Sequence, residues 1–319
     1  MPARPERSTQ TQARQVSTVA TNGLDDAAGT ARDLEQAAAV FAELRPRMFG
    51  IAYRMLGSVT EAEDVVQDAW LRWQNCDRSA VENPGAYLAT TTTRLAINVT
   101  QSARARRETY VGPWLPEPVD TSADPYLGAE RAEALEFAVL VIMERLSPNE
   151  RAAYVLREAF DYPYAQIAEI LQVSEAAVRQ LVSRARKRLA GERRSPAPAA
   201  EQRELLTAFL TAARSGDLTA LEGLFAADVV SYADGGGIVR ASRIPVLGST
   251  TVAKYIRAFA PTFWTGVDVE WGTTNGQESA LLRRDGELFA VLTLTASAEG
   301  IKQILWMMNP TKLSAVSAA

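Results

Sequence analysis

The segment LSPNERAAYVLREAFDYPYAQIAEILQVSEAAVRQLVSRARKRL, Leu146–Leu189, carries the local signals of three helices separated by short turns. Ser147–Glu150 has the residue types of a capping box, with Pro in the first helical position, and predicts the start of the first helix. A second helix is expected over Tyr164–Leu171 and a third from Glu175 to about Ala190. The turn between the last two ends at Ser174, which is a suitable N-cap.

The third helix is predicted to have one apolar and one basic face. From Arg131 to Glu169 the chain has four basic and seven acidic residues, whereas Glu175–Arg194 has seven basic and two acidic. A buried stripe is expected from apolar residues at helical spacing, namely Val178, Leu181, Val182, Ala185 and Leu189.

Two short helices joined by a tight turn, the second of them basic, predict a helix-turn-helix whose last helix enters the major groove of DNA. Arg and Gln near the start of such a helix can pair with base edges, while later Arg and Lys reach phosphates. The alternative is a solvated charged helix in a helical hairpin; the turn length, the cap and the one-sided charge favour DNA binding. The side chains expected to contact DNA are Ser174, Arg179, Gln180, Ser183, Arg184, Arg186, Lys187 and Arg188.

Composition limits the other possibilities. The 319 residues are 47% hydrophobic and 23% charged, which is typical of a soluble protein of two or three domains. The longest wholly apolar run, Phe137–Met143, is too short to span a membrane, and no secretory signal is recognisable, so we expect a cytoplasmic protein without a membrane partner. The single Cys76 and the lack of histidine make a disulfide, a metal site or an enzyme unexpected. The net charge of −4 argues against nonspecific coating of nucleic acid.

The chain divides into helical, linker and mixed segments. Pro113, Pro116, Pro118 and Pro125 interrupt the helical pattern, and GERRSPAPAA interrupts it a second time. The expected organisation is a disordered tail over 1–34, a helical domain over 35–110, a linker over 111–129, a second helical domain over 130–190, a linker over 191–200 and a last domain over 201–319.

The last domain is predicted to be α+β. Asn275-Gly276 and Asp285-Gly286 are favoured dipeptides of tight hairpins, and Glu299-Gly300 marks a third turn. They predict an antiparallel meander of four strands, and the helices come before it. The strands are expected near 267–273, 279–284, 287–295 and 301–308, and the helices near 201–214, 217–226 and 248–264.

Two stretches closely resemble a known family. AQIAEILQVSEAAVRQLVSRARKRL, Ala165–Leu189, resembles region 4 of the extracytoplasmic-function (ECF) group of sigma-70-family factors, and MFGIAYRMLGSVTEAEDVVQDAWLRW, Met48–Trp73, resembles region 2. The resemblance implies a factor that binds core RNA polymerase and recognises and melts promoter DNA. Region 4 would read the minus-thirty-five element. A DNA-binding regulator that acts without polymerase is the less favoured reading.

The resemblance also implies a polymerase-binding helix over Glu61–Trp73. In the family this helix docks on a basic coiled coil of the largest polymerase subunit, and complementary charge suits such a partner. Val65, Val66, Ala69 and Leu71 are expected to face the core. The polymerase-binding residues would be Glu61, Asp64, Gln67, Asp68 and Trp70.

The following helix, Pro84 to about Glu108, and the loop Asn75–Asn83 would bind and help melt the minus-ten element. Holding extruded bases in pockets and the separated strand on basic residues favours strand opening. Gln101 stands where an acidic residue is common, which leaves the base preference open. Core positions are expected at Tyr87, Leu88, Leu95 and Val99, and DNA contacts at Arg94, Asn98, Gln101, Arg104, Arg106 and Arg107.

Three further motifs resemble those of an ECF group that carries a fused SnoaL-like domain. They are WLPEP from Trp114, DGGG from Asp234 and NPTKL from Asn309. This implies a cone-shaped, nuclear transport factor 2-like fold that replaces a separate anti-sigma protein through contacts with the sigma regions. Ile238 and Thr311 depart from the group's pattern of Lys and Asp. The expected regulatory residues are Trp114, Leu115, Pro116, Asp234, Gly235, Gly236, Gly237, Asn309, Pro310, Lys312 and Leu313.

An alternative is that the last domain is a small-molecule sensor or enzyme. Folds of this type often hold an apolar pocket with an acid-base carboxylate, for which Asp228, Asp234 and Asp268 are the candidates. The glycine run beside Asp234 makes a structural turn the simpler role for that residue. No cofactor is expected, and a small-molecule ligand stays an open possibility.

Overall fold

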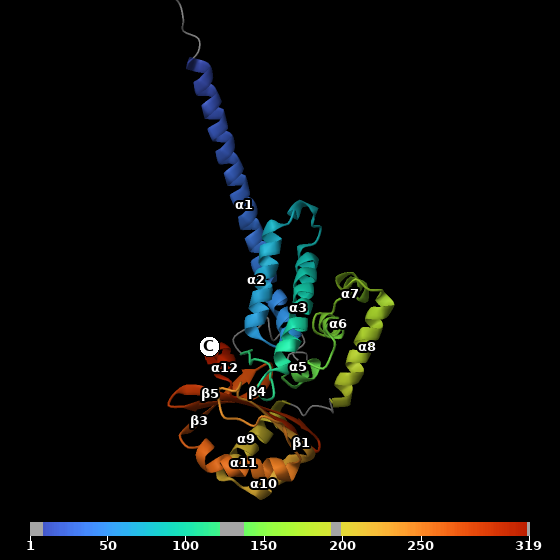
Figure 1. Ribbon diagram of the computed structural model, residues 1–319, viewed down its shortest axis with the longest axis vertical. Coiled ribbons are helices and arrows are strands. Elements are labelled where there is room, and N and C mark those ends of the chain that lie inside the picture. Colours follow the sequence, from blue (N-terminus) through green and yellow to red (C-terminus); the bar gives the residue numbers. More distant parts are fainter. Residues whose placement is uncertain (1–8, 122–136, 193–198, 318–319) are drawn as a thin grey trace, which may run out of the picture.

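The computed structural model describes residues 9–121, 137–192 and 199–317. Helices α1 to α3 and α5 to α8 lie together on one side of a mixed sheet, and α9 to α11 cover the opposite face of that sheet (Figure 1). No helix in these ranges combines the length and hydrophobicity that a bilayer span requires.

The first helical group is built on α1 (Thr9–Leu56), α2 (Val59–Asn75) and α3 (Pro84–Glu108), with a short 3₁₀ turn at Arg78–Ala80. Residues 9–34, expected to be disordered, instead continue α1. They hold no proline, so they can continue a helix whose C-terminal half is already packed.

Most of the expected core positions of this group are buried, and one is not. Val65, Val66 and Ala69 of α2 lie in the core, but Leu71 is 48% exposed. The prediction for Leu71 was wrong because its position on α2 falls outside the arc that faces α1 and α3. On α3, the core positions are the buried Leu88 and Leu95 and the half-buried Tyr87 and Val99.

The second helical group comprises α5 (Phe137–Met143), α6 (Pro148–Tyr154), a wider π turn at Val155–Ala159, α7 (Tyr164–Leu171) and α8 (Glu175–Glu192). The predicted capping box is confirmed, because Ser147 Oγ accepts from the Glu150 amide while the Glu150 carboxylate accepts from the Ser147 amide. Ser174 Oγ caps α8 by accepting from the Ala177 amide.

The two helical groups share one hydrophobic core, which runs without a break from α1 to α8. Phe160 is buried at their contact, with the guanidinium groups of Arg47 and Arg54 over its ring at 5.6 and 5.1 Å. Arg151, only 2% exposed, donates from α6 to the Met55 carbonyl of α1 at 2.8 Å. Regions far apart in sequence are therefore packed as one body.

The C-terminal unit contains a six-stranded sheet in the order β2-β1-β6-β5-β4-β3. The predicted antiparallel meander of the last four strands is confirmed. The parallel pairing of β1 with β6 was not predicted, nor was α12. The elements are α9 (Ala199–Ser215), α10 (Leu218–Leu224), β1 (Phe225–Asp234), β2 (Val246–Leu247), α11 (Ser249–Phe263), β3 (Val267–Thr274), β4 (Gln277–Arg284), β5 (Glu287–Ser297), β6 (Gly300–Met307) and α12 (Pro310–Ser317).

Both faces of the sheet are buried, by different partners. One face packs on α9, α10 and α11 to form the core of the unit. The other face carries a smaller cluster in which Leu115 of the linker meets Leu305 of β6 and Leu313 of α12, with Val141 of α5 packed against it. The linker is therefore held between the sheet and the helical groups.

Candidate DNA-contact surfaces and the junction that holds them

The side of α8 that the sequence predicts to face DNA is open to solvent, and its opposite side is buried. Val178, Val182, Ala185 and Leu189 are buried and Leu181 is half-buried, as the apolar stripe predicted. The side chains expected to contact DNA are all exposed: Ser174, Arg179, Gln180, Ser183, Arg184, Arg186, Lys187 and Arg188.

Acidic residues of α6 and of the π turn after it orient three arginines of α8. Arg184 and Arg188 donate to the two carboxylate oxygens of Glu150 at 2.8 and 3.0 Å, and Arg186 donates to Glu158 at 2.7 Å. The Glu150 side chain is only 6% exposed. Burial pushes the pKa of Glu150 up, but hydrogen bonds from Arg184 and Ser147 and the charge of Arg188 outweigh it, so its pKa lies below the ordinary value. Glu150 thus stays charged and holds Arg184 and Arg188 in place. Together with Arg186 they form what we call the arginine row of α8.

The exposed side of α3 borders an open hollow of about 580 Å³. Tyr87, Thr90 and Arg94 of α3 line it together with Asn75 and Cys76 from the end of α2. An aromatic ring, an amide and a guanidinium around one hollow can stack on a base and bind its edge. Asn98 and Gln101 are exposed on the same helix, whereas the side chains of Arg104 and Arg106 lie outside the described residues.

On α3, Arg94 and Arg107, both expected to contact DNA, also have intramolecular partners. Arg94 donates from Nε to the Ile170 carbonyl at 3.0 Å and from Nη2 to the Glu169 carbonyl at 3.2 Å, at the end of α7. Arg107 is paired with Glu144, and its guanidinium lies 3.6 Å from the centre of the Trp114 ring. Arg94 thus ties α3 to the helix-turn-helix, and Arg107 belongs to the linker junction.

The expected polymerase-binding face of α2 is mostly exposed. Asp64, Gln67 and Asp68 are exposed, while Glu61 and Trp70 are half-buried. The Trp70 ring packs on Phe41 with the ring centres 5.0 Å apart. Asp64 and Asp68 therefore make the exposed face of α2 acidic.

Asp234, at the end of β1, is fully buried and holds the linker. Its Oδ2 accepts from the Leu115 amide at 2.9 Å and from Lys312 Nζ at 2.8 Å, and its Oδ1 accepts from the Tyr110 hydroxyl at 2.5 Å and the Gly236 amide at 3.0 Å. Every lone pair direction of the carboxylate is thereby used, as a buried charge requires. We call Asp234, Lys312, Tyr110 and Asn309 the linker clamp.

Lys312, on α12, is the cation of the clamp. Its side chain is 7% exposed, and Nζ also donates to the Leu115 carbonyl at 2.6 Å and lies 4.2 Å from the Trp114 ring centre. Burial lowers the pKa of Lys312, and the Asp234 carboxylate opposes this. One buried ion pair therefore binds both backbone polar groups of Leu115, because Asp234 accepts from its N–H and Lys312 donates to its C=O.

The glycine run after Asp234 lets the backbone pass against the clamp. A Cβ on Gly236 would lie 2.4 Å from Asn309 Nδ2, and a Cβ on Gly235 would lie 2.4 Å from the Val239 carbonyl oxygen. Gly236 and Gly237 have φ of 61° and 73°, which is the left-handed region. Asn309 Nδ2 in turn donates to the Tyr110 hydroxyl at 2.8 Å.

The remaining motif residues lie around the clamp. Leu115 and Leu313 are buried in the cluster on the outer sheet face, and Pro116 is also buried. Trp114 is half-buried, and a Cβ on Gly57, in the turn between α1 and α2, would lie 2.8 Å from its ring. Pro310 is exposed at the first position of α12.

A second anchor of the linker was not predicted from the sequence. Asn275, in the β3–β4 hairpin, is fully buried; its Nδ2 donates to the Tyr53 hydroxyl of α1 at 2.7 Å and its Oδ1 accepts from the Val119 amide at 3.0 Å. The Tyr53 hydroxyl donates to the Glu117 carbonyl at 2.5 Å. Asn275-Gly276 indicated the hairpin, but a turn signal does not reveal which distant side chain the turn contacts.

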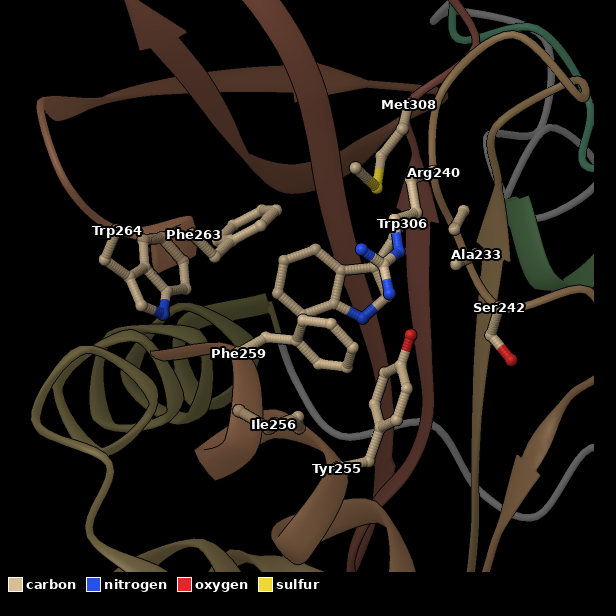
Figure 2. A pocket seen from close by; sticks show the side chains of 11 residues that line it. Ala233, Arg240, Ser242, Tyr255, Ile256, Phe259, Phe263, Trp264, Trp306 and Met308 are labelled. Atoms are coloured by element: carbon tan, nitrogen blue, oxygen red, sulfur yellow. The ribbon is translucent and has the colours of Figure 1, made fainter. Parts of the chain in front are cut away.

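The C-terminal unit also contains an aromatic cavity of about 210 Å³ between α11 and the sheet (Figure 2). None of the three candidate catalytic carboxylates lines it. Asp234 is held in the clamp, Asp228 is paired with Lys302, and Asp268 is exposed on β3.

Comparison with known proteins gives consistent matches to one family. The model "Sigma-70 region 2" matches residues 40–108, and "Sigma-70, region 4" matches residues 136–189. ECF RNA polymerase sigma factor SigJ of Mycobacterium tuberculosis is 39% identical over 232 residues, which are 71% of this chain and 74% of that protein. Probable ECF RNA polymerase sigma factor SigI of the same organism is 28% identical over 278 residues, 86% and 93% of the two chains. The crystal structure of M. tuberculosis SigJ superposes with a TM-score of 0.70 at 33% identity, covering 87% of this chain and 98% of that one.

Proposed function

This chain belongs to the extracytoplasmic-function sigma factors of the sigma-70 family, which initiate transcription, and we propose that its C-terminal unit keeps the two DNA-reading regions in a closed arrangement that must open at a promoter. Region 2 and region 4 imply core RNA polymerase and promoter DNA as partners. The fused unit would take the place of a separate anti-sigma protein.

We assign the parts of the chain to these roles by residue range. Residues 35–110 would bind polymerase and the minus-ten element, and residues 130–190 the minus-thirty-five element. The linkers would be 111–129 and 191–200, and residues 201–319 would be a SnoaL-like, nuclear transport factor 2-like domain. Helices α9 to α11 packed on one face of a sheet with a four-stranded meander support this last assignment.

The observation that carries the proposal is the position of Arg94. This side chain lines the α3 hollow, where a promoter base would be held, and it also binds the Glu169 and Ile170 carbonyls of α7. Promoter elements at minus ten and minus thirty-five lie about 25 base pairs apart, which is about 85 Å along B-form DNA. A region 4 that touches Arg94 of region 2 cannot reach its own element at the same time, so the closed chain would bind promoters poorly.

The linker is the means by which the C-terminal unit would maintain closure. The clamp fixes Leu115, the Asn275 anchor fixes Val119 and Tyr53 on the region 2 side, and Val141 of region 4 packs on the same outer sheet face. One unit thus contacts both DNA-reading regions. Tethering keeps the effective concentration of such contacts high, so individually weak contacts suffice.

Once open, the chain would use separate surfaces for each partner. Asp64, Gln67 and Asp68 on α2 would meet a basic surface of polymerase, with Glu61 and Trp70 at its edge. The α3 hollow would hold an unpaired base of the melted strand, with Asn98 and Gln101 beside it. The arginine row on α8 would lie in the major groove.

A test uses the contact between the helical groups. Phe160→Ala removes a buried ring at that contact without touching the DNA-facing residues, and loss of a buried Phe costs about 3–5 kcal/mol. The full chain carrying Phe160→Ala, reconstituted with core polymerase, should bind and transcribe a promoter selected from randomised DNA more strongly than the unaltered chain.

The matched control is Phe289→Ala, which truncates a half-buried ring inside the C-terminal unit. Circular dichroism would establish that both variants are folded. Equal promoter binding by all three proteins, or weaker binding by Phe160→Ala alone, would refute the closed arrangement as an inhibited state.

A further inference from the structure

The aromatic cavity of the C-terminal unit has a built lining that the clamp does not use. Phe259 and Phe263 of α11 and Trp306 of β6 face one another across it, with Trp264 at one end and Tyr255 and Met308 at the other (Figure 2). Phe263 and Trp306 meet edge to face with ring centres 5.5 Å apart. Such walls favour a flat aromatic guest, because rings pack well edge to face and offset-stacked.

The polar groups of the cavity lie together on one side. Tyr255 brings a hydroxyl, and Arg240 brings a guanidinium that makes no ion pair with any described residue (Figure 2). The Ser242 hydroxyl points away from the rings and donates to the Ile244 carbonyl at 2.6 Å. No carboxylate is among the lining residues. The indole N–H of Trp306 already donates to Ser231 Oγ at 3.2 Å. The cavity is therefore apolar with one cationic edge, which suits an anionic group on an otherwise apolar ligand.

The volume limits the size of that ligand. At about 210 Å³ the cavity is smaller than the roughly 300–1,000 Å³ of sites for drug-sized molecules. It is larger than the roughly 150 Å³ of a cavity that holds benzene. We propose that this cavity binds an aromatic carboxylate of one or two rings.

The cavity and the clamp share strands, so occupancy of one should affect the other. Ala233 and Met308 line the cavity, and each is the direct neighbour of a clamp residue, Asp234 or Asn309. The Met308 amide donates to the Asp234 carbonyl at 2.8 Å. A ligand shifts a protein toward the conformation to which it binds more tightly. A ligand that fits the cavity as it is shaped with the clamp closed therefore stabilises the closed clamp. The consequence for transcription rests on the proposed function; binding and clamp stabilisation do not.

The binding test uses the full chain and 1-naphthoate as the probe, with 1-naphthalenemethanol as its uncharged counterpart. Calorimetry and quenching of tryptophan fluorescence should show one site for naphthoate. Arg240→Gln should weaken naphthoate binding about tenfold or more, as for loss of a charge-assisted hydrogen bond, and should leave the alcohol unaffected. Ala241→Phe, which adds a ring at a lining position, should abolish binding of both. Arg243→Gln, an exposed charge in the same loop but outside the lining, is the control.

Absence of naphthoate binding, or equal affinities in the Arg240→Gln and Arg243→Gln variants, would overturn the proposal. The link to the clamp is read by hydrogen exchange of the Leu115 amide, which naphthoate should slow. Binding without slower exchange would refute the coupling. Neither result would alter the outcome of the Phe160→Ala experiment, which tests the closed arrangement itself.

Discussion

Replacing Lys312 by Met tests whether a buried ion pair holds the linker. The change keeps an unbranched side chain of similar reach and removes the ammonium group that binds Asp234 and the Leu115 carbonyl. Asp234, which is fully buried, would keep three neutral donors but lose its cation. The clamp should then open far more often.

The expected magnitude follows from burial. Removing one partner of a buried ion pair costs about 3–5 kcal/mol, and the three donors that remain on Asp234 favour the lower end. A loss of about 3 kcal/mol raises the opening equilibrium on the order of a hundredfold. Lys302 is the matched control, because its partner Asp228 is 65% exposed and such surface pairs contribute about 0–1 kcal/mol.

Hydrogen exchange of the Leu115 amide in the full chain measures this opening directly, since that amide donates to Asp234. Lys312→Met should exchange on the order of a hundredfold faster, and Lys302→Met should match the unaltered chain. The Asp234→Asn/Lys312→Met double variant should lose less than the sum of the single variants, because it leaves no unpaired charge. Identical Leu115 exchange in the two lysine variants would refute the clamp as the element that fixes the linker.

Three further predictions concern other parts of the chain. In urea titrations, Gly236→Ala should reduce the free energy of unfolding by clearly more than Gly266→Ala. Both positions have positive φ, so either alanine costs about 1–2 kcal/mol, but of the two only a Cβ on Gly236 meets another group. Equal losses would contradict the packing of the glycine run. The pKa of Glu150 in the folded chain lies below its ordinary value of 4.5, so the charged Glu150 stabilises the fold above that pH and this contribution is lost as pH falls through the lowered pKa. The difference in unfolding free energy between the unaltered chain and Glu150→Gln should therefore shrink on acidification. A difference that grows on acidification would contradict the arginine pairing. Arg179→Ala should reduce the binding free energy by about 1–3 kcal/mol at the preferred minus-thirty-five sequence and by little on unrelated DNA, whereas Lys187→Ala should weaken binding to both DNAs alike. DNA binding at several salt concentrations measures both effects. Equal losses on both DNAs for Arg179→Ala would rule out Arg179 as a base-reading residue.

The local elements could be predicted from the sequence because their signals are local. The capping box at Ser147, the N-cap at Ser174 and the dipeptide Asn275-Gly276 each depend on a few neighbouring residues, and each lies where the pattern indicated. β1 was missed because it has no turn dipeptide before it, and its parallel pairing with β6 depends on a strand some seventy residues away.

The contacts between distant segments were harder to predict from the sequence. The resemblance indicated that the motifs at Trp114, Asp234 and Asn309 belong to one regulatory group. Nothing in the sequence indicated that Asp234 accepts from the Leu115 N–H while Lys312 donates to the Leu115 carbonyl. Arg94 matched a DNA-binding pattern, and its pairing with two carbonyls of α7 depends on how two domains pack. Such pairings have no periodicity that a single sequence can display.

We propose that region 2 and region 4, which share a core in the chain by itself, separate at a promoter. The most direct test is the distance between spin labels at Ser102 on α3 and Ala165 on α7, both exposed, with Cys76 replaced by Ser. One short distance is expected in the full chain alone. The distance should increase by tens of Å when core polymerase and promoter DNA are added, toward the roughly 85 Å between the two elements. An unchanged short distance in a complex that transcribes from the promoter would contradict the separation of the two regions.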